Sequence, residues 1–301
     1  MAMTQAERTA AYQRVVAALG VGMIGTGLAA KPLPPRGGRA DVRATALPIE
    51  AEIRGIQMYE FGETWGRPGL DFKTRSFITM AVLVALRTPD QLYRHINIAL
   101  NLGITPEEVH EMLLHGATYA GFAAWEIACG VANEVFVARG ILESGTGVEI
   151  IPVPAMDHEQ REAARTRICA VLNVGKVGSG PDAKVLTALP GGPSYHGRAN
   201  PLEQEIAFIT ADYGYGEVWG RTGLALKIRS FVTMTILATM RENHQLHIHI
   251  ANGLNIGITR DEVNEMLAQI AVYLGGSGWH NAITVARHIF EQHPGCVEQA
   301  G

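Results

Sequence analysis

Two stretches of the chain read almost alike: FGETWGRPGLDFKTRSFITM at Phe61–Met80 and YGEVWGRTGLALKIRSFVTM at Tyr215–Met234. They lie 154 positions apart and align without a gap. The same offset carries NLGITPEEVHEML at Asn101–Leu113 onto NIGITRDEVNEML at Asn255–Leu267. Self-similarity at a fixed offset indicates a tandem duplication, and each copy is about as long as a domain.

A further pair of similar segments upstream extends each copy toward its N-terminal end. RVVAALGVG from Arg14 matches RICAVLNVG from Arg167 at an offset of 153. We therefore predict a first domain at residues 1–150 and a second at 151–301. This similarity also bears on the apolar stretch Val15–Ala30, which has the sequence pattern of a secretory signal. Because its counterpart lies deep inside the chain, we interpret this stretch as part of the fold.

Helix signals follow the repeated stretch. Apolar residues crowd almost all round the segment 73–87, which follows the W-G-R-x-G-L turn, as in a helix buried between others. Gly103 is a candidate C-terminal cap, and Thr105 precedes Glu108 by three residues, which is a capping-box spacing. No segment alternates with a period of two, so we predict an all-α fold, with helices in the first copy at residues 73–87, 90–102, 106–119 and 122–139. Glycine and proline are dense at 31–38, 140–154 and 175–201, which we interpret as loops.

Composition sets aside several classes of protein. The chain has 301 residues, 47% hydrophobic and 18% charged, with 25 basic and 29 acidic residues and a net charge of −4. It has no basic block for nucleic acid and no apolar run of about 18 residues for a membrane span. Cys129, Cys169 and Cys296 are far apart and form no C-x-x-C, so neither a disulfide framework nor a thiolate metal site is predicted. We expect a cytoplasmic protein whose partner is a small molecule.

The motifs that occur twice, in the same order, resemble the carboxymuconolactone decarboxylase family. They are G-E-x-W-x-R-x-G-L, R-S-F, a histidine on the next helix, G-I-T-x-[DE]-E and Y-x-G, over roughly residues 59–136 and 213–290. The resemblance implies two homologous helical domains of the alkylhydroperoxidase-like fold in tandem. Because such subunits associate through their helices, it also implies a homo-oligomer, a trimer of fused pseudo-dimers. The activity is expected to be either cofactor-free decarboxylation of an unsaturated lactone acid or thiol-dependent peroxide reduction.

The sequence argues against the peroxidase chemistry. Peroxidases of this fold carry C-x-x-C-x-x-x-H at the start of the second helix. Here the cysteine places hold Thr88 and Gln91 in the first copy and Glu242 and Gln245 in the second. Without a thiolate there is no nucleophile for the peroxide.

Decarboxylation of a conjugated acid makes three demands on a site. It needs donors for the developing enolate oxygen, a general acid or base, and apolar surroundings that disfavour the substrate carboxylate. Imidazole titrates nearest neutral pH, so the helix histidines are the acid/base candidates, and arginines are suited to hold a carboxylate. The predicted catalytic residues are His95, His249, Glu63 and Glu217, and the predicted substrate-binding residues are Arg67, Arg221, Arg75, Arg229, Trp65, Trp219, Tyr119 and Tyr273; no metal and no cofactor is expected.

Structural roles remain open for each of these residue types. The histidines, tryptophans and tyrosines are alternatively core residues. Arg67 and Arg221 are alternatively ion-paired with Glu63 or Glu217, and the other two arginines alternatively tie down helix ends and subunit contacts. The two glutamates alternatively orient a histidine or an arginine.

The second copy differs from the first in ways that leave function open. His244, His247 and His249 invite a metal interpretation, although residues two apart on a helix do not share a face. The copies are alternatively specialised, one catalysing while the other forms a wall of its site. Two other functions stay open beside decarboxylation: proton transfer on a bulkier substrate, and binding without catalysis.

Overall fold

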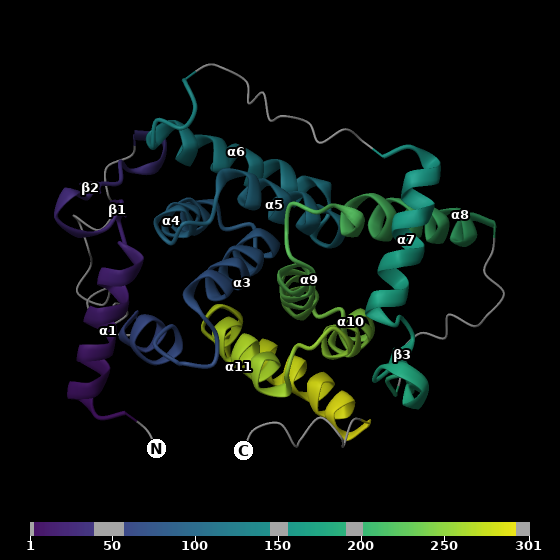
Figure 1. The fold of residues 1–301 in the computed structure, drawn as a ribbon. Helices are drawn as coiled ribbons and strands as arrows, with labels where there is room; N and C mark the ends of the chain where they lie inside the picture. The colour runs from purple at the N-terminus through teal and green to yellow at the C-terminus, as the bar shows by residue number, and fades with distance from the viewer. Residues whose placement is uncertain (1–2, 39–56, 145–155, 191–200, 293–301) are drawn as a thin grey trace.

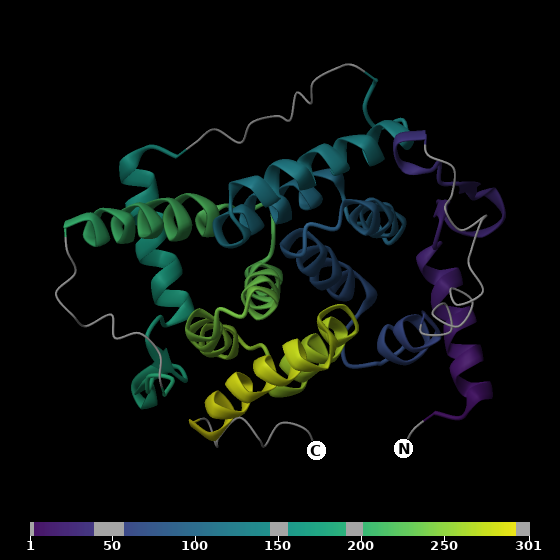
Figure 2. The same cartoon turned by 180° about the vertical axis from the view of Figure 1, so that it is seen from behind.

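The structure is a computed structural model that describes residues 3–38, 57–144, 156–190 and 201–292. Helices α3 (Phe72–Ala85) and α9 (Leu226–Met240), one from each copy, lie side by side at the centre (Figure 1). Helix α5 (Pro106–Ala120) packs on α9, and α11 (Arg260–Gln292) packs on α3 from the other side, as the view from behind also shows (Figure 2). Helix α5 of the first copy and helix α11 of the second thus each pack against the central helix of the other copy.

Among the described residues the elements of the two copies follow the same order, apart from η2 (Arg36–Gly38) in the first and α8 (Pro201–Ile209) in the second. The first contains α1 (Gln5–Leu19), β1 (Met23–Ile24), η1 (Gly27–Ala29), β2 (Lys31–Pro32), η2, η4 (Met58–Thr64), α3, α4 (Pro89–Asn101), α5 and α6 (Phe122–Ala138). The second contains α7 (His158–Leu172), β3 (Lys176–Val177), η5 (Gly180–Asp182), β4 (Lys184–Val185), α8, η6 (Thr210–Val218), α9, α10 (Asn243–Asn255) and α11. The mostly helical fold and the four predicted helices of the first copy are confirmed. Helix α11 corresponds to α5 and α6 together, with a kink at Gly275 where the first copy breaks at Gly121.

The helix ends at Thr105 and Gly103 form as the sequence predicts, and Asp71 adds a cap that was not predicted. The Thr105 hydroxyl accepts from the Glu108 amide at 3.2 Å, and the Glu108 carboxylate accepts from the Thr105 amide at 2.9 Å. Gly103 follows α4 at φ 76°, a left-handed conformation in which a side chain would be strained. Asp71 caps α3 by accepting from the Thr74 amide at 3.0 Å.

Two short antiparallel hairpins, β1–β2 and β3–β4, are an addition to the predicted all-α architecture. Each strand has two residues, too few to show an alternating pattern. A partly buried amide fastens each hairpin to a helix. Asn101 donates to the carbonyls of Leu19 (3.1 Å) and Met23 (2.9 Å), and Asn255 repeats these contacts in the second copy by donating to Leu172 (2.9 Å) and Lys176 (3.0 Å).

The segment before the W-G-R motif is a π-helix in both copies, which the sequence did not predict. In η4 the Trp65 amide donates to the Glu60 carbonyl at 2.9 Å, the five-residue spacing of a π-helix. This wider winding sets the positions of Glu60 and Trp65. In the second copy, the Trp219 amide likewise donates to the Gly214 carbonyl.

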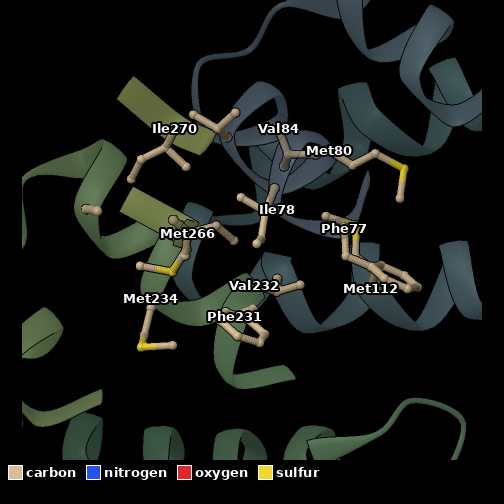
Figure 3. Packing of buried hydrophobic residues seen from close by; sticks show 14 of the residues in the cluster. Phe77, Ile78, Met80, Val84, Met112, Phe231, Val232, Met234, Met266 and Ile270 are labelled. Atoms are coloured by element: carbon tan, nitrogen blue, oxygen red, sulfur yellow. The ribbon is translucent and has the colours of Figure 1, made fainter. Parts of the chain in front are cut away.

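Both copies contribute to one main hydrophobic core. Figure 3 shows Phe77 and Ile78 of α3 close to Phe231 and Val232 of α9. The α1 side chains Val15 and Leu19 pack in a smaller cluster with Phe61 and Trp65. This contact confirms the interpretation of the apolar N-terminal stretch as part of the fold. The predicted domain division at 150/151, most of the loop 140–154 and the end of the loop 175–201 lie outside the described residues.

Candidate active sites at the interface of the two copies

Two ion-pair clusters join the copies. The first ion-pair cluster consists of Arg67, Arg75 and Glu265. Glu265 of α11 accepts from Arg75 Nη2 at 2.7 Å and from Arg67 Nη2 at 2.6 Å. Arg75 has no exposed side-chain surface, whereas the Arg67 side chain is 50% exposed. Burial raises the pKa of Glu265, but the hydrogen bonds from the two guanidinium groups outweigh it, so the pKa is lowered on balance.

The second ion-pair cluster mirrors the first with the copies exchanged. It consists of Glu111 of α5 with Arg221 and Arg229 of the second copy. Arg229 Nη2 donates to Glu111 Oε2 at 2.7 Å, and Arg221 Nε donates to Glu111 Oε1 at 2.7 Å. The Arg221 side chain is only 7% exposed. Arg75 and Arg229 therefore hold the copies together, which was the structural alternative considered for them, and their binding of substrate stays a prediction.

The first site surrounds His95, and we define it as Trp65, His95, Tyr273 and Glu60. The rings of Trp65 and His95 are stacked with centroids 6.0 Å apart. Tyr273, from the second copy, meets the His95 ring edge-on at 6.4 Å and donates from its hydroxyl to Glu60 Oε1 at 2.7 Å. The site is thus built from both copies, with the histidine from one and the tyrosine from the other.

The second site surrounds His249, and we define it as Trp219, His249, Tyr119 and His115. Trp219 and His249 are stacked at 6.0 Å, and Tyr119 of the first copy meets His249 edge-on at 5.4 Å. Here the tyrosine hydroxyl accepts from Trp219 Nε1 at 2.7 Å. His115 lies against Trp219 with ring centroids 4.8 Å apart, and its Nε2 is 2.8 Å from Thr233 Oγ1.

Burial keeps both central imidazoles neutral. It lowers the pKa of His95 to about 3 and that of His249 to about 4. The side chains are 3% and 2% exposed, and Nδ1 of each has no hydrogen-bond partner within the described part of the chain. The expectation that these histidines titrate near neutral pH therefore does not hold, because burial disfavours the charged ring. Near pH 7 each ring is therefore suited to form a hydrogen bond as a neutral group, because burial disfavours the imidazolium that gain of a proton would create.

The two predicted catalytic glutamates have other partners. Glu63 forms an ion pair with Arg8 of α1. Glu217 accepts from the Met156 amide at 2.9 Å and lies 3.9 Å from Arg221 Nη1. The Glu63 ion pair holds α1 against η4, and the Glu217 hydrogen bond holds the segment just before α7 against η6. The catalytic role of both glutamates stays a prediction.

The three histidines of α10 do not converge. His249 faces Trp219 and Tyr119, whereas the His247 ring lies beside His288 at 5.2 Å. Within residues 3–38, 57–144, 156–190 and 201–292, no group of three or more side chains is placed to hold a metal ion. No helix of the described ranges combines the length and apolar character that crossing a membrane requires.

The family can be assigned from the whole sequence. The sequence profile of the carboxymuconolactone decarboxylase family matches residues 53–134 and 205–288, which together make up more than half of the chain. The chain belongs to the carboxymuconolactone decarboxylase family. The two matches fall on the two copies, so the duplicated unit is the family domain.

Each of the relatives described next aligns with only part of this chain. The chain is 44% identical over 86 residues to the 4-carboxymuconolactone decarboxylase of Acinetobacter baylyi, which is 29% of this chain and 64% of that protein. It is 38% identical over 66 residues to the nitrosuccinic acid decarboxylase of Metarhizium robertsii, 22% of this chain and 46% of that protein. An uncharacterized 15.0 kDa protein of Paracoccus denitrificans is 34% identical over 79 residues, 25% of this chain and 58% of that protein. In each case the alignment spans less than two thirds of the relative.

Several residues of the two sites and of the ion-pair clusters were not predicted from the sequence. Glu111 and Glu265 occur in the repeated string that ends in E-M-L, and a charge kept in both copies beside apolar positions was the available signal. Glu60 gave no such signal, because its counterpart in the second copy is Gly214. The counterpart of His115 is Gln269, which is also not repeated in kind.

Proposed function

We propose that the chain is a cofactor-independent carboxy-lyase acting on a small unsaturated acid, such as a carboxylated lactone. The observation that carries the proposal is the buried, neutral His95 between Trp65 and Tyr273, in a family whose relatives include two named decarboxylases. In such a substrate the conjugated carbonyl accepts the electron pair that the departing CO2 leaves behind, so the bond can break without a cofactor. The protein must then stabilise the enolate and return a proton to carbon.

Burial supports the first requirement of this chemistry. A carboxylate that enters apolar surroundings loses hydration, and loss of CO2 removes its charge. Trp65, with 0% exposure, and His95 supply such surroundings at the first site. Neutral His95 is then the candidate hydrogen-bonding group for the enolate, and His249 holds the matching place at the second site.

Arg67 is our candidate for holding the substrate carboxylate. Arg75 and Arg229 are fully buried, and each uses its guanidinium group on carbonyl and carboxylate partners. Arg67 pairs with Glu265 but keeps half of its side chain exposed. A half-exposed guanidinium group can bind a second carboxylate with less rearrangement of its surroundings than a fully buried one.

Release of CO2 tests the proposal directly. Purified, chelator-treated protein is incubated with 4-carboxymuconolactone, nitrosuccinate and related unsaturated acids and lactones, and CO2 is measured. Release that survives chelation supports the carboxy-lyase. Solvent deuterium entering a substrate without CO2 release would replace it with a proton-transfer enzyme, and tight binding without either reaction would indicate a binding protein.

A further inference from the structure

The two sites differ in one chemical group. At the first site the Tyr273 hydroxyl donates to Glu60, a partly buried carboxylate on η4. At the matching place of the second site stands Gly214, and the Tyr119 hydroxyl instead accepts from Trp219. Only the first site therefore couples its tyrosine to a carboxyl group among the described residues.

The geometry points to Glu60 and Tyr273 as a proton-delivering pair, in which Tyr273 protonates the substrate carbon and Glu60 replaces the proton that Tyr273 gives up. This inference rests on the proposed function. It assigns the protonation step of the decarboxylation to the first site and leaves the second site without the pair.

The step balances as follows. The bond between the substrate carbon and its carboxylate breaks, CO2 leaves, and the electron pair enters the conjugated carbonyl to give an enolate. The enolate carbon then takes the hydroxyl proton of Tyr273 while the carboxyl proton of Glu60 moves to the tyrosine oxygen. Glu60, left as a carboxylate, takes a proton from water, which its partial exposure allows. Overall, the substrate loses its carboxylate group as CO2 and takes up one proton, which forms the new C–H bond.

The surroundings explain why the two groups must act together. Burial raises the pKa of Tyr273 well above its ordinary value, and the neighbouring Glu60 charge raises it further. A free phenolate is therefore disfavoured, and Tyr273 can give up its proton only if another proton replaces it at once. The 2.7 Å contact with Glu60 supplies that path once Glu60 is protonated, because the carboxyl group then donates across the same contact to the tyrosine oxygen and frees the hydroxyl proton for the substrate.

Glu60 is suited to carry the replacement proton. Burial raises the pKa of this carboxyl, an effect that the Tyr273 hydrogen bond partly offsets. Of the elements packed on η4, α11 contributes Tyr273 and α1 contributes Arg8, whose guanidinium is paired with Glu63. A carboxyl whose pKa rises toward the working pH is a more efficient acid catalyst at that pH.

Kinetics of Glu60→Gln and Tyr273→Phe in the full chain test the inference. We expect each to lower kcat by about 10²-fold, and the double variant to be no slower than either single one, because the pair acts as a unit. The wild-type kcat should fall on the alkaline side as Glu60 loses its proton, and this limb should be absent in Glu60→Gln. Glu107→Gln, at an exposed position of α5, serves as the matched carboxyl-to-amide control and should leave kcat unchanged.

A reciprocal variant tests the same idea by gain of function. Gly214→Glu places a carboxyl beside Tyr119, and its Cβ would meet only Thr118 Cγ2, at an ordinary 3.6 Å. Added to Glu60→Gln, it should recover part of the lost kcat. An active wild type with an unchanged Glu60→Gln variant would overturn the inference and leave the carboxy-lyase standing.

Infrared titration separates failure of the inference from failure of the proposed function. If the wild type releases no CO2 from any substrate, the proposed function fails. The pair is then judged by the carboxyl stretch, which in the wild type should persist above the ordinary Glu range of about pH 4.3 and should vanish in Glu60→Gln. In Tyr273→Phe it should persist to still higher pH, because the hydrogen bond that favours the carboxylate is gone. No carboxyl titrating above that range would overturn the pair whatever the activity.

Discussion

Arg75 of the first copy and Glu265 of the second form a 2.7 Å ion pair in which the arginine has no exposed surface. Arg229 and Glu111 form the same pair with the copies exchanged, also at 2.7 Å. Each arginine begins a central helix, and each glutamate comes from the helix that the other copy packs against it. The copies are therefore held together by charges that neither could satisfy alone.

Removal of one carboxylate should destabilise the protein strongly. In Glu265→Ala the buried Arg75 charge loses its partner, and breaking such a pair typically costs about 3–5 kcal/mol. Glu111→Ala should cost a similar amount through Arg229. Urea unfolding measures both, with exposed Glu107→Ala as the control expected within about 0.5 kcal/mol of wild type. A loss below about 1 kcal/mol would mean that water reaches the arginine and replaces the carboxylate.

Acidification should lower stability in two stages. The unfolded chain protonates its histidines below about pH 6.5, whereas folded His95 and His249 stay neutral down to about pH 3 and about pH 4, so protons favour unfolding over this interval. Each histidine should contribute a loss on the order of 1 kcal/mol per pH unit there. Below about pH 4.3 the lowered pKa values of Glu111 and Glu265 add a second loss as these carboxylates protonate.

Unfolding curves measured from about pH 8 to about pH 3 would show both stages. His95→Gln and His249→Gln should each flatten the first stage and leave the second in place. A first stage unchanged in both variants would contradict the assignment of neutral, buried imidazoles.

Substitution of the site histidines should affect turnover. If the proposed carboxy-lyase uses them to hydrogen-bond the enolate, His95→Ala should lower kcat by about 10²-fold or more in a folded protein. The first site has the Glu60–Tyr273 pair, so His249→Ala should cost less. Steady-state CO2 release measures both, with circular dichroism as the check on folding. Full activity in both single variants and in the double variant would remove the histidines from the mechanism.

An asparagine buried in the second copy should be replaceable with a gain in stability. Asn252 has 0% exposure, and neither of its amide atoms has a hydrogen-bond partner in the described part of the chain. Its counterpart in the first copy is Ile98. Asn252→Ile should therefore raise the free energy of unfolding by about 1–3 kcal/mol. Asn255→Leu is the matched comparison and should lower it, because the Asn255 amide fastens a hairpin.

The outcome of the Asn252 substitution also reports on the second site. Asn252 lies one helical turn after His249 on α10. A loss of stability, measured by urea unfolding, would show that the amide has a bound partner in solution.

Self-association is expected from the surface of α8. Ile206, Phe208 and Ile209 are each more than half exposed, an apolar surface that soluble monomers rarely leave uncovered. Light scattering should give a mass that is a multiple of the 32.4 kDa chain, and a trimer is the form we propose. Phe208→Glu with Ile209→Lys should reduce that mass. A strict monomer for the wild type would contradict the proposal.

Helices and their ends were predictable from the sequence, whereas contacts between the copies were not. The caps at Thr105 and Gly103 depend on neighbouring residues, so their spacing is sufficient to place helix ends. The pairing of Arg75 with Glu265 depends on how two copies pack, and the sequence of one copy does not say which helix will cover it. Comparison of the two copies identifies residues that both copies contain. It did not identify Glu60, because the matching position in the second copy is Gly214.

Fusion of the copies removes a constraint that a symmetric dimer cannot escape. In a dimer of identical chains, position 60 and its counterpart must carry the same side chain, and any change appears in both halves at once. In this chain a glutamate occupies one place and a glycine the other. Covalent linkage also fixes the ratio of the two unlike sites at one to one and prevents the mixed assemblies that two separate genes would produce. The duplicated chain is in effect an obligate heterodimer, in which one half can change while the other keeps its original side chains.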